Sequence, residues 1–557
     1  MTAVQLRKVI ERLLRKAPIR LRQNAKEWFA LGQKLADSLS NHRNRRQVLH
    51  RLSRRYTFLL SAVVGILAGT LAVLYKTCVN TLTLAEIYTS TRVPRDWWWL
   101  PLLLAPLGGL LGWLACRLTS RFCPEAGGSG IPHVKSVLLG LRRIRPLPLL
   151  GTKLTGGLLA LGAGLSLGRE GPTVHMGAAC ADWLGERLDV PHRTRKSLVA
   201  AGAGAGLAAA FNAPLAGFLF IMEELRREMS RVTYGSALVS TVMAVAVARL
   251  LQGQANSFGL VEVAPIPLVQ LPVVIGVAAV AGLLGLLFNR SLLLLLELRD
   301  RKRWRPETLG VVVGVVGMLL LCWCTPLTGG GHLLTHSALS GELHYSLLAL
   351  AALFVAKLLF TVASYATGVP GGLFAPVLTL GALVGSLAGQ LLAIGLPTYS
   401  PRPEMLATVG MAALLTSSVR APLTGVVLIV EMTGQYNLLY ALMLGAWVAY
   451  MLAEYIGDEP LYEALLRRDL HHQRRLWKHE ARAVEVLVEP NSEWEHIPLS
   501  RFPRHKDLLV ALLERDGHMH IPHGTTMVEA GDMLTLLVGP DMPESDLNDY
   551  LEMARDH

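Results

Sequence analysis

Charged residues are scarce in this chain of 557 residues: Asp, Glu, Lys and Arg make up 17% of it, and 52% is hydrophobic. A soluble chain of this length carries more charge. The spacing of its six cysteines fits neither a zinc site nor a disulfide framework. The apolar stretches also lack a Gly-x-Ser-x-Gly elbow, a His-Glu-x-x-His motif, paired aspartates and a Thr-Val-Gly-Tyr-Gly filter. These absences argue against a soluble protein, an intramembrane enzyme and a potassium channel, and we expect no metal and no cofactor.

Long apolar runs fill residues 57–456. Runs of about 18 or more such residues predict membrane-spanning helices, and this region has room for on the order of ten of them. The sequence therefore predicts an all-α polytopic membrane protein. Its clearest runs are residues 57–75, 99–116, 147–167, 235–251, 267–297, 308–324 and 346–362.

The positive charge is concentrated at the start of the chain. Residues 1–55 contain 15 Lys or Arg and only three acidic residues, so they account for +12 of the net charge of +13. Basic residues before a first span place that end of the chain in the cytoplasm, and we expect both termini there, with the protein in a bacterial inner membrane. Aromatic residues do not interleave with the basic ones, so the segment does not resemble a nucleic-acid-binding region. We expect these residues to form a basic amphipathic helix on the membrane surface.

Two blocks of the apolar region resemble each other. "FNAPLAGFLFIMEE" (211–224) aligns with "VRAPLTGVVLIVEM" (419–432), and upstream of them lie two Gly/Pro-rich breaks, "GREGPTVHMGA" (168–178) and "GVPGGLFAPVLTLGA" (368–382). Interrupted helices at corresponding places of a duplicated sequence are typical of transporters built from repeats. We expect repeats over roughly 56–250 and 265–457, within a membrane domain of residues 56–468.

The tail has a different composition. After a charged linker at 469–479, residues 480–557 predict a small cytoplasmic α+β domain with a regulatory or assembly role. "VEVLVEP" predicts a strand, "LSRFPRHKDLLVALLERDG" a helix ending at Gly517, and "HMHIPHGTTMVEAGDMLTLLVGP" two strands around a turn. The alternating histidines of "HMHIPH" would share one face of a strand, but no Cys or carboxylate completes a metal site.

Three breaks share one chemistry. "GGSGIPHV" (127–134), "GREGPTV" (168–174) and "GGLFAPV" (371–377) each place flexible glycines before a proline near a helix start. Irregular backbone at membrane depth is tolerated where it lines a cavity or is buried in protein. The exposed N–H groups and the positive end of a helix dipole attract anions. Three converging starts would hold a dehydrated anion without a full positive charge, so that it is easily released.

In order and spacing, "GSGIP", "GREGP" and "GGLFAP" resemble the signature motifs of the CLC chloride channel and transporter family. "RAPLTGVVLIVEMTG" and "EPLYEALL" look like further family blocks, so the resemblance covers about 55–468. It implies an inverted-repeat fold with broken, re-entrant helices, assembled as a homodimer with one pore per subunit. Chloride, protons and membrane lipid are the implied partners.

The resemblance also implies residue roles. The Ser129 hydroxyl and the Tyr462 phenol would donate to a central anion from opposite sides, and backbone N–H groups of the breaks would complete central and outer sites. Family members with proline in place of this serine resemble nitrate transporters, so Ser129 favours chloride. Arg169 would be local electrostatic scaffolding. The implied anion-binding set is Ser129, Gly168, Arg169, Gly171, Gly372, Leu373, Phe374 and Tyr462.

Two glutamates match the proton-handling residues of the family. Glu170 matches the gating glutamate, which competes with anions for the outer site and swings away when protonated; intramembrane carboxylates are typical proton carriers. The alternative is a structural ion pair with Arg169, although adjacent residues at a helix start do not face each other. Glu224 matches the internal proton glutamate of exchangers, whereas Glu223 looks structural. For Glu224 the alternative is a solvated helix cap.

These features favour a chloride/proton antiporter over a passive chloride channel of the same family. Residues 482–540 resemble, more weakly, the C-terminal subdomain of potassium-transport regulators (RCK_C, or TrkA-C), mainly through "TTMVEAGDMLTLLVGP". That resemblance implies regulation by a small cytoplasmic ligand or by dimerisation.

Overall fold

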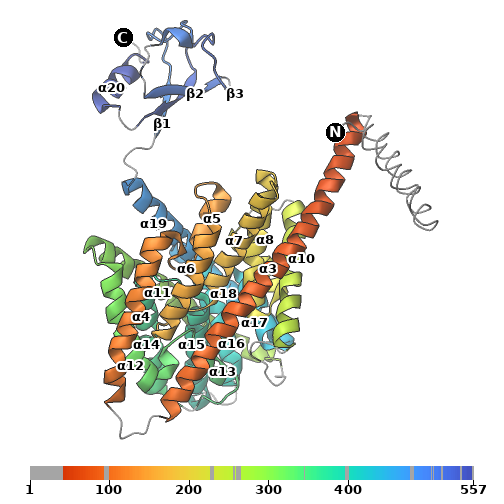
Figure 1. The fold of residues 1–557 in the computed structure, drawn as a ribbon, viewed down its shortest axis with the longest axis vertical. Helices are drawn as coiled ribbons and strands as arrows, with labels where there is room; N and C mark the ends of the chain where they lie inside the picture. The colour runs from red at the N-terminus through yellow and green to blue at the C-terminus, as the bar shows by residue number, and fades with distance from the viewer. Residues whose placement is uncertain are drawn as a thin grey trace, which may run out of the picture. The chain divides into compact units, whose positions relative to one another are not determined.

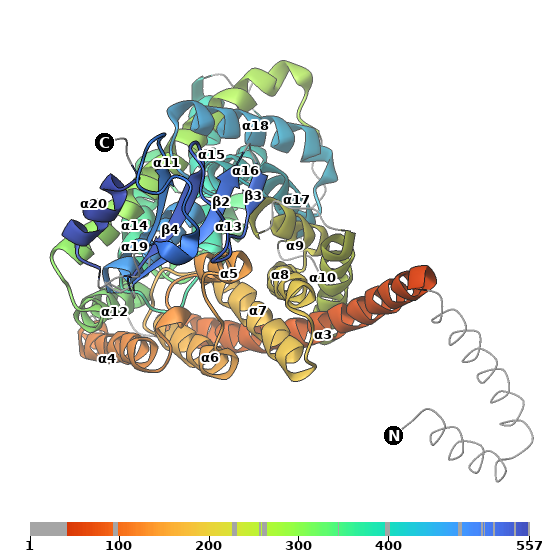
Figure 2. The ribbon, with the colours of Figure 1, turned by 90° about the horizontal axis from the view of Figure 1, so that it is seen from above.

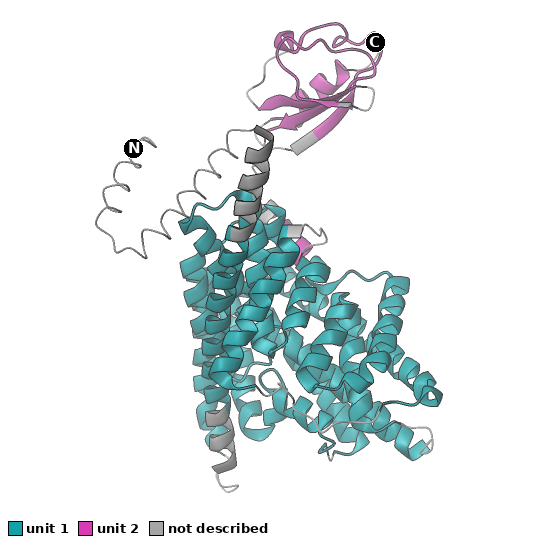
Figure 3. Ribbon diagram, turned by 90° about the vertical axis from the view of Figure 1, so that its right-hand side faces the viewer, with its two compact units in different colours: residues 1–464 teal, residues 465–557 magenta. Residues whose placement is uncertain are grey.

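The computed structural model divides into two compact units, residues 1–464 and 465–557 (Figure 3). They are described separately below. The structure describes residues 42–92, 99–225, 231–254, 258, 265–343, 345–395, 401–476, 482–502, 505, 507–515, 518–539 and 542–554.

Helices are the only regular secondary structure among the described residues of the first unit (Figure 1). Eight of the described helices are long and apolar enough to cross a membrane, and shorter apolar helices lie between them. This confirms a polytopic membrane protein. Its helices, with α19 continuing into the second unit, are α3 (His42–Arg92), α4 (Leu100–Phe122), α5 (Ile131–Leu139), α6 (Pro146–Gly162), α7 (Glu170–Arg187), α8 (His192–Phe211), α9 (Pro214–Phe220), α10 (Arg231–Gln252), α11 (Leu271–Arg301), α12 (Pro306–Trp323), α13 (His332–Leu339), α14 (Leu347–Ala366), α15 (Phe374–Gly395), α16 (Pro403–Val419), α17 (Pro422–Thr433), α18 (Leu439–Ile456) and α19 (Leu461–Leu476).

The helices form two neighbouring groups. In the first group α8 packs against α3, α7 and α10, and in the second α16 packs against α11, α15 and α18. Figure 2 shows the first group, in orange and yellow, beside the second, in green and blue-green, with α12 lying along α4. The most deeply buried helices, α7, α8, α15 and α16, are rich in Gly and Ala, which lets their backbones approach closely.

The basic segment differs in part from its prediction. Residues 42–55 continue directly into the first span within the single helix α3. The predicted separate helix on the membrane surface is therefore wrong for residues 42–55, because no break ends the helix before the apolar run begins. The rest of that prediction, residues 1–41, lies outside the described residues.

Helices α9 and α17 cap each other. The Glu223 carboxylate, just after α9, accepts hydrogen bonds from the Leu423 and Thr424 N–H groups at 3.0 and 2.7 Å. In return the Glu431 carboxylate of α17 accepts them from the Leu215 and Ala216 N–H groups at 3.1 and 2.8 Å. Each helix start thus meets a carboxylate from the far end of the other, so the two helices run antiparallel. The sequence aligns Glu223 with Glu431, and here they make matching contacts.

The loops before α5 and α13 also match. Each has a 3₁₀ turn, Pro124–Ala126 or Thr325–Leu327, and then a glycine with positive φ at the helix start. A buried lysine holds each loop. Lys153 Nζ donates to the Gly128 carbonyl at 2.7 Å. Lys357 Nζ donates to the carbonyls of residues 327, 328 and 329 at 2.9, 3.1 and 3.0 Å. Burying an ammonium costs free energy unless its protons are satisfied; the loop carbonyls supply three partners for Lys357 and one for Lys153.

The second unit contains a four-stranded antiparallel sheet in the order β1-β4-β2-β3, formed by β1 (Arg482–Leu487), β2 (Leu508–Arg515), β3 (His518–His520) and β4 (Met533–Val538). A helix, α20 (Glu544–Glu552), follows. The predicted helix ending at Gly517 is wrong, since "LLVALLER" forms strand β2. Pairing with β4 outweighs the helix preference of its leucines. The histidines of "HMHIPH" do not all share a strand either, because β3 ends at His520.

The sheet has one apolar face. Leu534, Leu536 and Val538 alternate along β4 and are buried, together with Trp494 and the α20 residue Leu547. This alternation is typical of a strand with one buried face. The tail therefore has its own hydrophobic core, as the α+β prediction requires.

Candidate functional site

Backbone hydrogen bonds tie the three broken segments together. The Gly128 N–H donates to the Val369 carbonyl and the Gly371 N–H to the Gly128 carbonyl, both at 3.0 Å. Gly168 and Gly372 exchange a pair of bonds, at 2.8 and 2.7 Å. The third break thus forms a short bridge with each of the other two. The predicted convergence of the three helix starts is confirmed.

Close packing explains two glycines of this junction. A Cβ added to Gly171 would lie 2.9 Å from the Gly372 Cα and 3.0 Å from the Ser129 Cα. One added to Gly372 would approach the Gly171 nitrogen. Any larger residue would therefore separate the starts of α5, α7 and α15. Because the N–H groups at a helix start have no partner within the helix, this junction is suited to a negative charge.

Aromatic rings and a hydroxyl surround the junction. Ser129 is fully buried, and its Oγ accepts a hydrogen bond from the Ile131 N–H at 3.4 Å. Phe374, the first residue of α15, stacks on the Tyr462 ring with centroids 6.0 Å apart. Leu373 and Tyr462 are buried as well. The structure brings Ser129, Phe374 and Tyr462 to the region that the sequence assigns to a central anion.

Glu170 is the first residue of α7, and none of its side chain is exposed. Its Oε2 lies so close to Gly168 that a Cβ there would collide with it. The carboxylate therefore folds back over the second break, towards the start of α15. Neither carboxylate oxygen accepts a hydrogen bond from the residues that the structure describes. A buried carboxylate without such bonds is costly, which is typical of a functional group.

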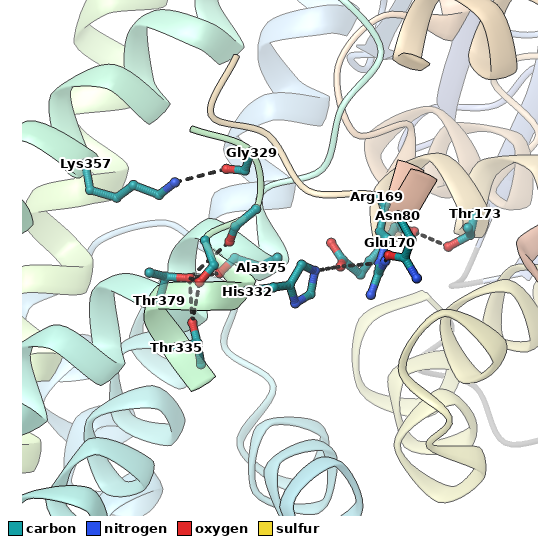
Figure 4. A network of polar contacts seen from close by, with 12 residues as sticks. Asn80, Arg169, Glu170, Thr173, Gly329, His332, Thr335, Lys357, Ala375 and Thr379 are labelled. Atoms are coloured by element: carbon teal, nitrogen blue, oxygen red, sulfur yellow. Dashed lines mark hydrogen bonds and ion pairs between the residues drawn. The ribbon is translucent and has the colours of Figure 1, made fainter. Parts of the chain in front are cut away.

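Arg169 makes a shorter contact with Asn80 than with the neighbouring glutamate. Its guanidinium donates to the Asn80 side chain at 2.5 Å, whereas its Nε lies 3.9 Å from Glu170 Oε1. The nearer polar group to Glu170 is His332, whose Nε2 lies 3.6 Å from the same oxygen (Figure 4). Arg169, His332 and Asn80 line a cavity of about 400 Å³. Arg169 and Glu170 therefore form only a long ion pair, at 3.9 Å.

Glu224 occupies a different environment. It lies in a π-helical turn, Ile221–Leu225, and is buried. The Lys135 ammonium is 2.7 Å from its carboxylate and 3.8 Å from that of Glu463, beside Tyr462. Lys135 lies four residues after Ile131, the start of α5, about 6 Å along that helix. Single π turns inside α-helices occur frequently at functional sites.

Three side chains of this region were not predicted from the sequence: Lys135, His332 and Asn80. Lys135 had a signal, since it is a charged residue just after "GSGIP" in an apolar helix. His332 and Asn80 had none, because only the fold brings them to Arg169 and Glu170. The region also contains a buried histidine pair, His133 and His175, with ring nitrogens 2.9 Å apart.

The broken helices, their converging starts and the buried carboxylate define a polytopic membrane transporter or channel with an anion pathway. The family described as voltage gated chloride channel matches residues 111–454. This chain belongs to that family, the CLC channels and transporters. Residues 483–542 match the TrkA-C domain, which confirms the resemblance of the tail.

Relatives and solved structures agree with this assignment. The H(+)/Cl(-) exchange transporter ClcA of Vibrio cholerae is 37% identical over 426 residues, which cover 74% of this chain and 90% of the relative. ClcA of Cronobacter sakazakii is 37% identical over 441 residues, 77% of this chain and 93% of that one. The crystal structure of a slow cyanobacterial Cl⁻/H⁺ antiporter superposes with a TM-score of 0.70 at 34% identity, covering 75% of this chain and 99% of that one.

Proposed function

We propose that this protein exchanges chloride for protons across a bacterial inner membrane. The observation that carries the proposal is the Glu170 carboxylate, buried and folded over Gly168 where three helix starts meet. There it takes the place of an anion. Protonation removes its charge and releases the site to chloride, so one side chain couples the two ions. The related ClcA proteins are named as exchangers of the same two ions.

The surrounding groups then bind chloride at two positions. The Ser129 hydroxyl, the Tyr462 phenol and the backbone N–H groups of Leu373 and Phe374 hold the central ion. Backbone N–H groups around Gly168–Gly171, in the second break, line the outer position, near Arg169. These backbone and hydroxyl donors are dipoles, not full charges, and so they release the ion readily. Gly372, in the third break, is the remaining residue of the proposed anion-binding set.

The orientation of the protein in the membrane is proposed from the charge distribution along α3. Basic residues before Tyr56 favour a cytoplasmic position for that end of the helix, and we propose a cytoplasmic tail as well. Asn80 lies 24 residues further along, about 36 Å at 1.5 Å per residue. The cavity beside Arg169 therefore opens to the outside, and Glu170 exchanges protons with that side. Glu224 serves the cytoplasmic side.

The assembly part of the proposal is a homodimer with one pore per subunit. Residues 56–250 and 265–457 form its two inverted repeats, supported by the reciprocal contacts of Glu223 and Glu431. The tail adds a regulatory domain that binds a small cytoplasmic ligand or pairs with a second copy. Cross-linking in native membranes tests the dimer.

A passive chloride channel is the second candidate, and one observation favours it. Lys135 lies 2.7 Å from the Glu224 carboxylate. An ammonium at that distance holds the carboxylate by a charge-assisted hydrogen bond. An exchanger must break this contact in each cycle, whereas a channel keeps it.

Glu170→Gln separates the two candidates. In an exchanger reconstituted in liposomes, the variant keeps chloride flux and loses all chloride-driven proton movement. Glu186→Gln, on an exposed glutamate at the other end of α7, is the matched control and keeps both fluxes. Proton movement that survives in Glu170→Gln contradicts the role of Glu170. A wild-type protein that moves chloride without protons is a channel.

A further inference from the structure

His332 lies next to Glu170 and also lines the cavity beside Arg169. His332 Nε2 lies 3.6 Å from Glu170 Oε1, and 34% of the imidazole side chain is exposed (Figure 4). One end of the ring thus faces a fully buried carboxylate while the side chain lines the cavity of about 400 Å³. His332 Nε2 is itself buried without a hydrogen-bond partner among the described residues.

The segment that carries His332 is firmly held. Lys357 donates to three carbonyls of residues 327–329. The next carbonyl, that of Gly330, accepts a hydrogen bond from the Thr379 hydroxyl at 3.0 Å, and Thr379 also pairs with Thr335 at 2.8 Å. Gly331 then turns the chain through a positive φ of 79° into α13. This network fixes the backbone of His332 relative to α15, as a residue that must meet Glu170 requires.

The corresponding loop, before α5, has a different kind of residue at the position of His332. The residue that starts α5 after its positive-φ glycine is Ile131, which is apolar and fully buried. The residue that starts α13 is His332, which is ionisable and partly exposed. An aliphatic residue serves the packing role at the first position. The imidazole therefore has a use beyond filling space.

We propose that His332 relays protons between the outer solution and Glu170. In the inward step Nε2–H passes its proton to the Glu170 carboxylate while the other ring nitrogen takes one from a hydronium ion in the cavity, which becomes water. The ring then returns to its first tautomer, and the reverse sequence releases a proton outward. A distance of 3.6 Å exceeds a hydrogen bond and is closed by a small ring rotation or by one water. The proposal rests on the exchange function above.

The surroundings of the ring suit this task. Burial lowers the pKa of His332 below its usual value; Arg169 and Lys76 lower it further, and Glu170 opposes them. Asn80 of α3 contributes no charge and is bound to Arg169. The ring is therefore mainly neutral at pH 7 and holds one proton on one of its two nitrogens, the form that a relay by tautomer exchange requires.

The test compares His332→Ala and His332→Gln with wild type by chloride turnover in liposomes, at outer pH from 5 to 8. We expect a fall of about five- to tenfold at pH 7 that shrinks as the outer solution is acidified, because direct protonation of Glu170 then becomes fast. Imidazole added outside restores most of the turnover of His332→Ala, since the cavity admits it. His336→Ala, which removes another histidine of the same cavity, is the control and behaves as wild type.

A second comparison separates a relay from a structural role. In a Glu170→Gln background no proton has to reach residue 170, so adding His332→Ala leaves turnover unchanged. Equal turnover of wild type and His332→Ala at every pH overturns the relay. So does a uniform loss that imidazole does not restore, or a loss that persists in Glu170→Gln. A wild-type protein without proton movement overturns the exchange function as well, and is thereby distinguishable from failure of the relay alone.

Discussion

The reciprocal caps of α9 and α17 allow the loss of one cap to be compared with the loss of the other. The Glu223 carboxylate accepts two backbone N–H bonds and one from the Thr424 hydroxyl, at 2.7 to 3.0 Å. Glu431 accepts two backbone bonds, at 2.8 and 3.1 Å. A charged cap contributes roughly 1 kcal/mol for each well-made bond at partly exposed positions. Glu223→Gln therefore lowers the free energy of unfolding by about 2 to 3 kcal/mol, and Glu431→Gln by about 1 to 2 kcal/mol.

Function separates the two variants. Glu223 adjoins Glu224 in the π-helical turn, whereas the residue after Glu431 is Met432. Losing the anchor at α17 lets that turn relax to an ordinary helix, which moves the Glu224 carboxylate out of its buried position. Glu223→Gln should therefore weaken proton coupling, and Glu431→Gln should keep it.

Thermal unfolding in detergent and paired chloride and proton fluxes in liposomes provide the two readouts. Similar unfolding temperatures for wild type and both variants would refute the capping energies. Equal loss of coupling in both variants would refute the link between the π turn and Glu224.

Helix packing and tail stability give two further predictions. Gly177→Ala should cost about 1 to 3 kcal/mol or more, because the new Cβ overlaps the Gly202 carbonyl, while Gly162→Ala, with open space around it, should be neutral in thermal unfolding. In the tail, burial alone raises the pKa of Asp532, but hydrogen bonds from Arg515 and a backbone N–H lower it below its usual value. The Asp532 carboxyl therefore takes up its proton at a higher pH in the unfolded tail than in the folded one, so the stability of the tail falls as the pH drops below about 4. Pepsin cleavage in this pH range checks the prediction: it should become faster as the pH falls, and less so in Asp532→Asn.

The membrane body was predictable because its signals are local. Long apolar runs mark the spans, and glycines followed by proline mark the broken starts of α5, α7 and α15. The family motifs then named Ser129 and Glu170. The bonds that join the breaks were not predictable from local sequence, because Gly128 and Gly371 are far apart in the chain.

The wrong and missing predictions also concern contacts between segments that only the fold brings together. "LLVALLER" suits a helix by composition, and only pairing with β4 makes it a strand. His332 lies in a plain glycine-rich stretch, and only the loop held by Lys357 and Thr379 brings it to Glu170. Lys135 was visible as a charge in an apolar helix, but its partner Glu224 comes from another element.

The most direct test of the central claim is a measurement of proton movement driven by chloride alone. Purified protein in liposomes is given an outward chloride gradient without a pH gradient, and the inner pH is followed. Exchange predicts that protons move inward against their own developing gradient as chloride leaves, and that Glu170→Gln abolishes this. Chloride efflux without that uphill proton movement in wild type would contradict the account.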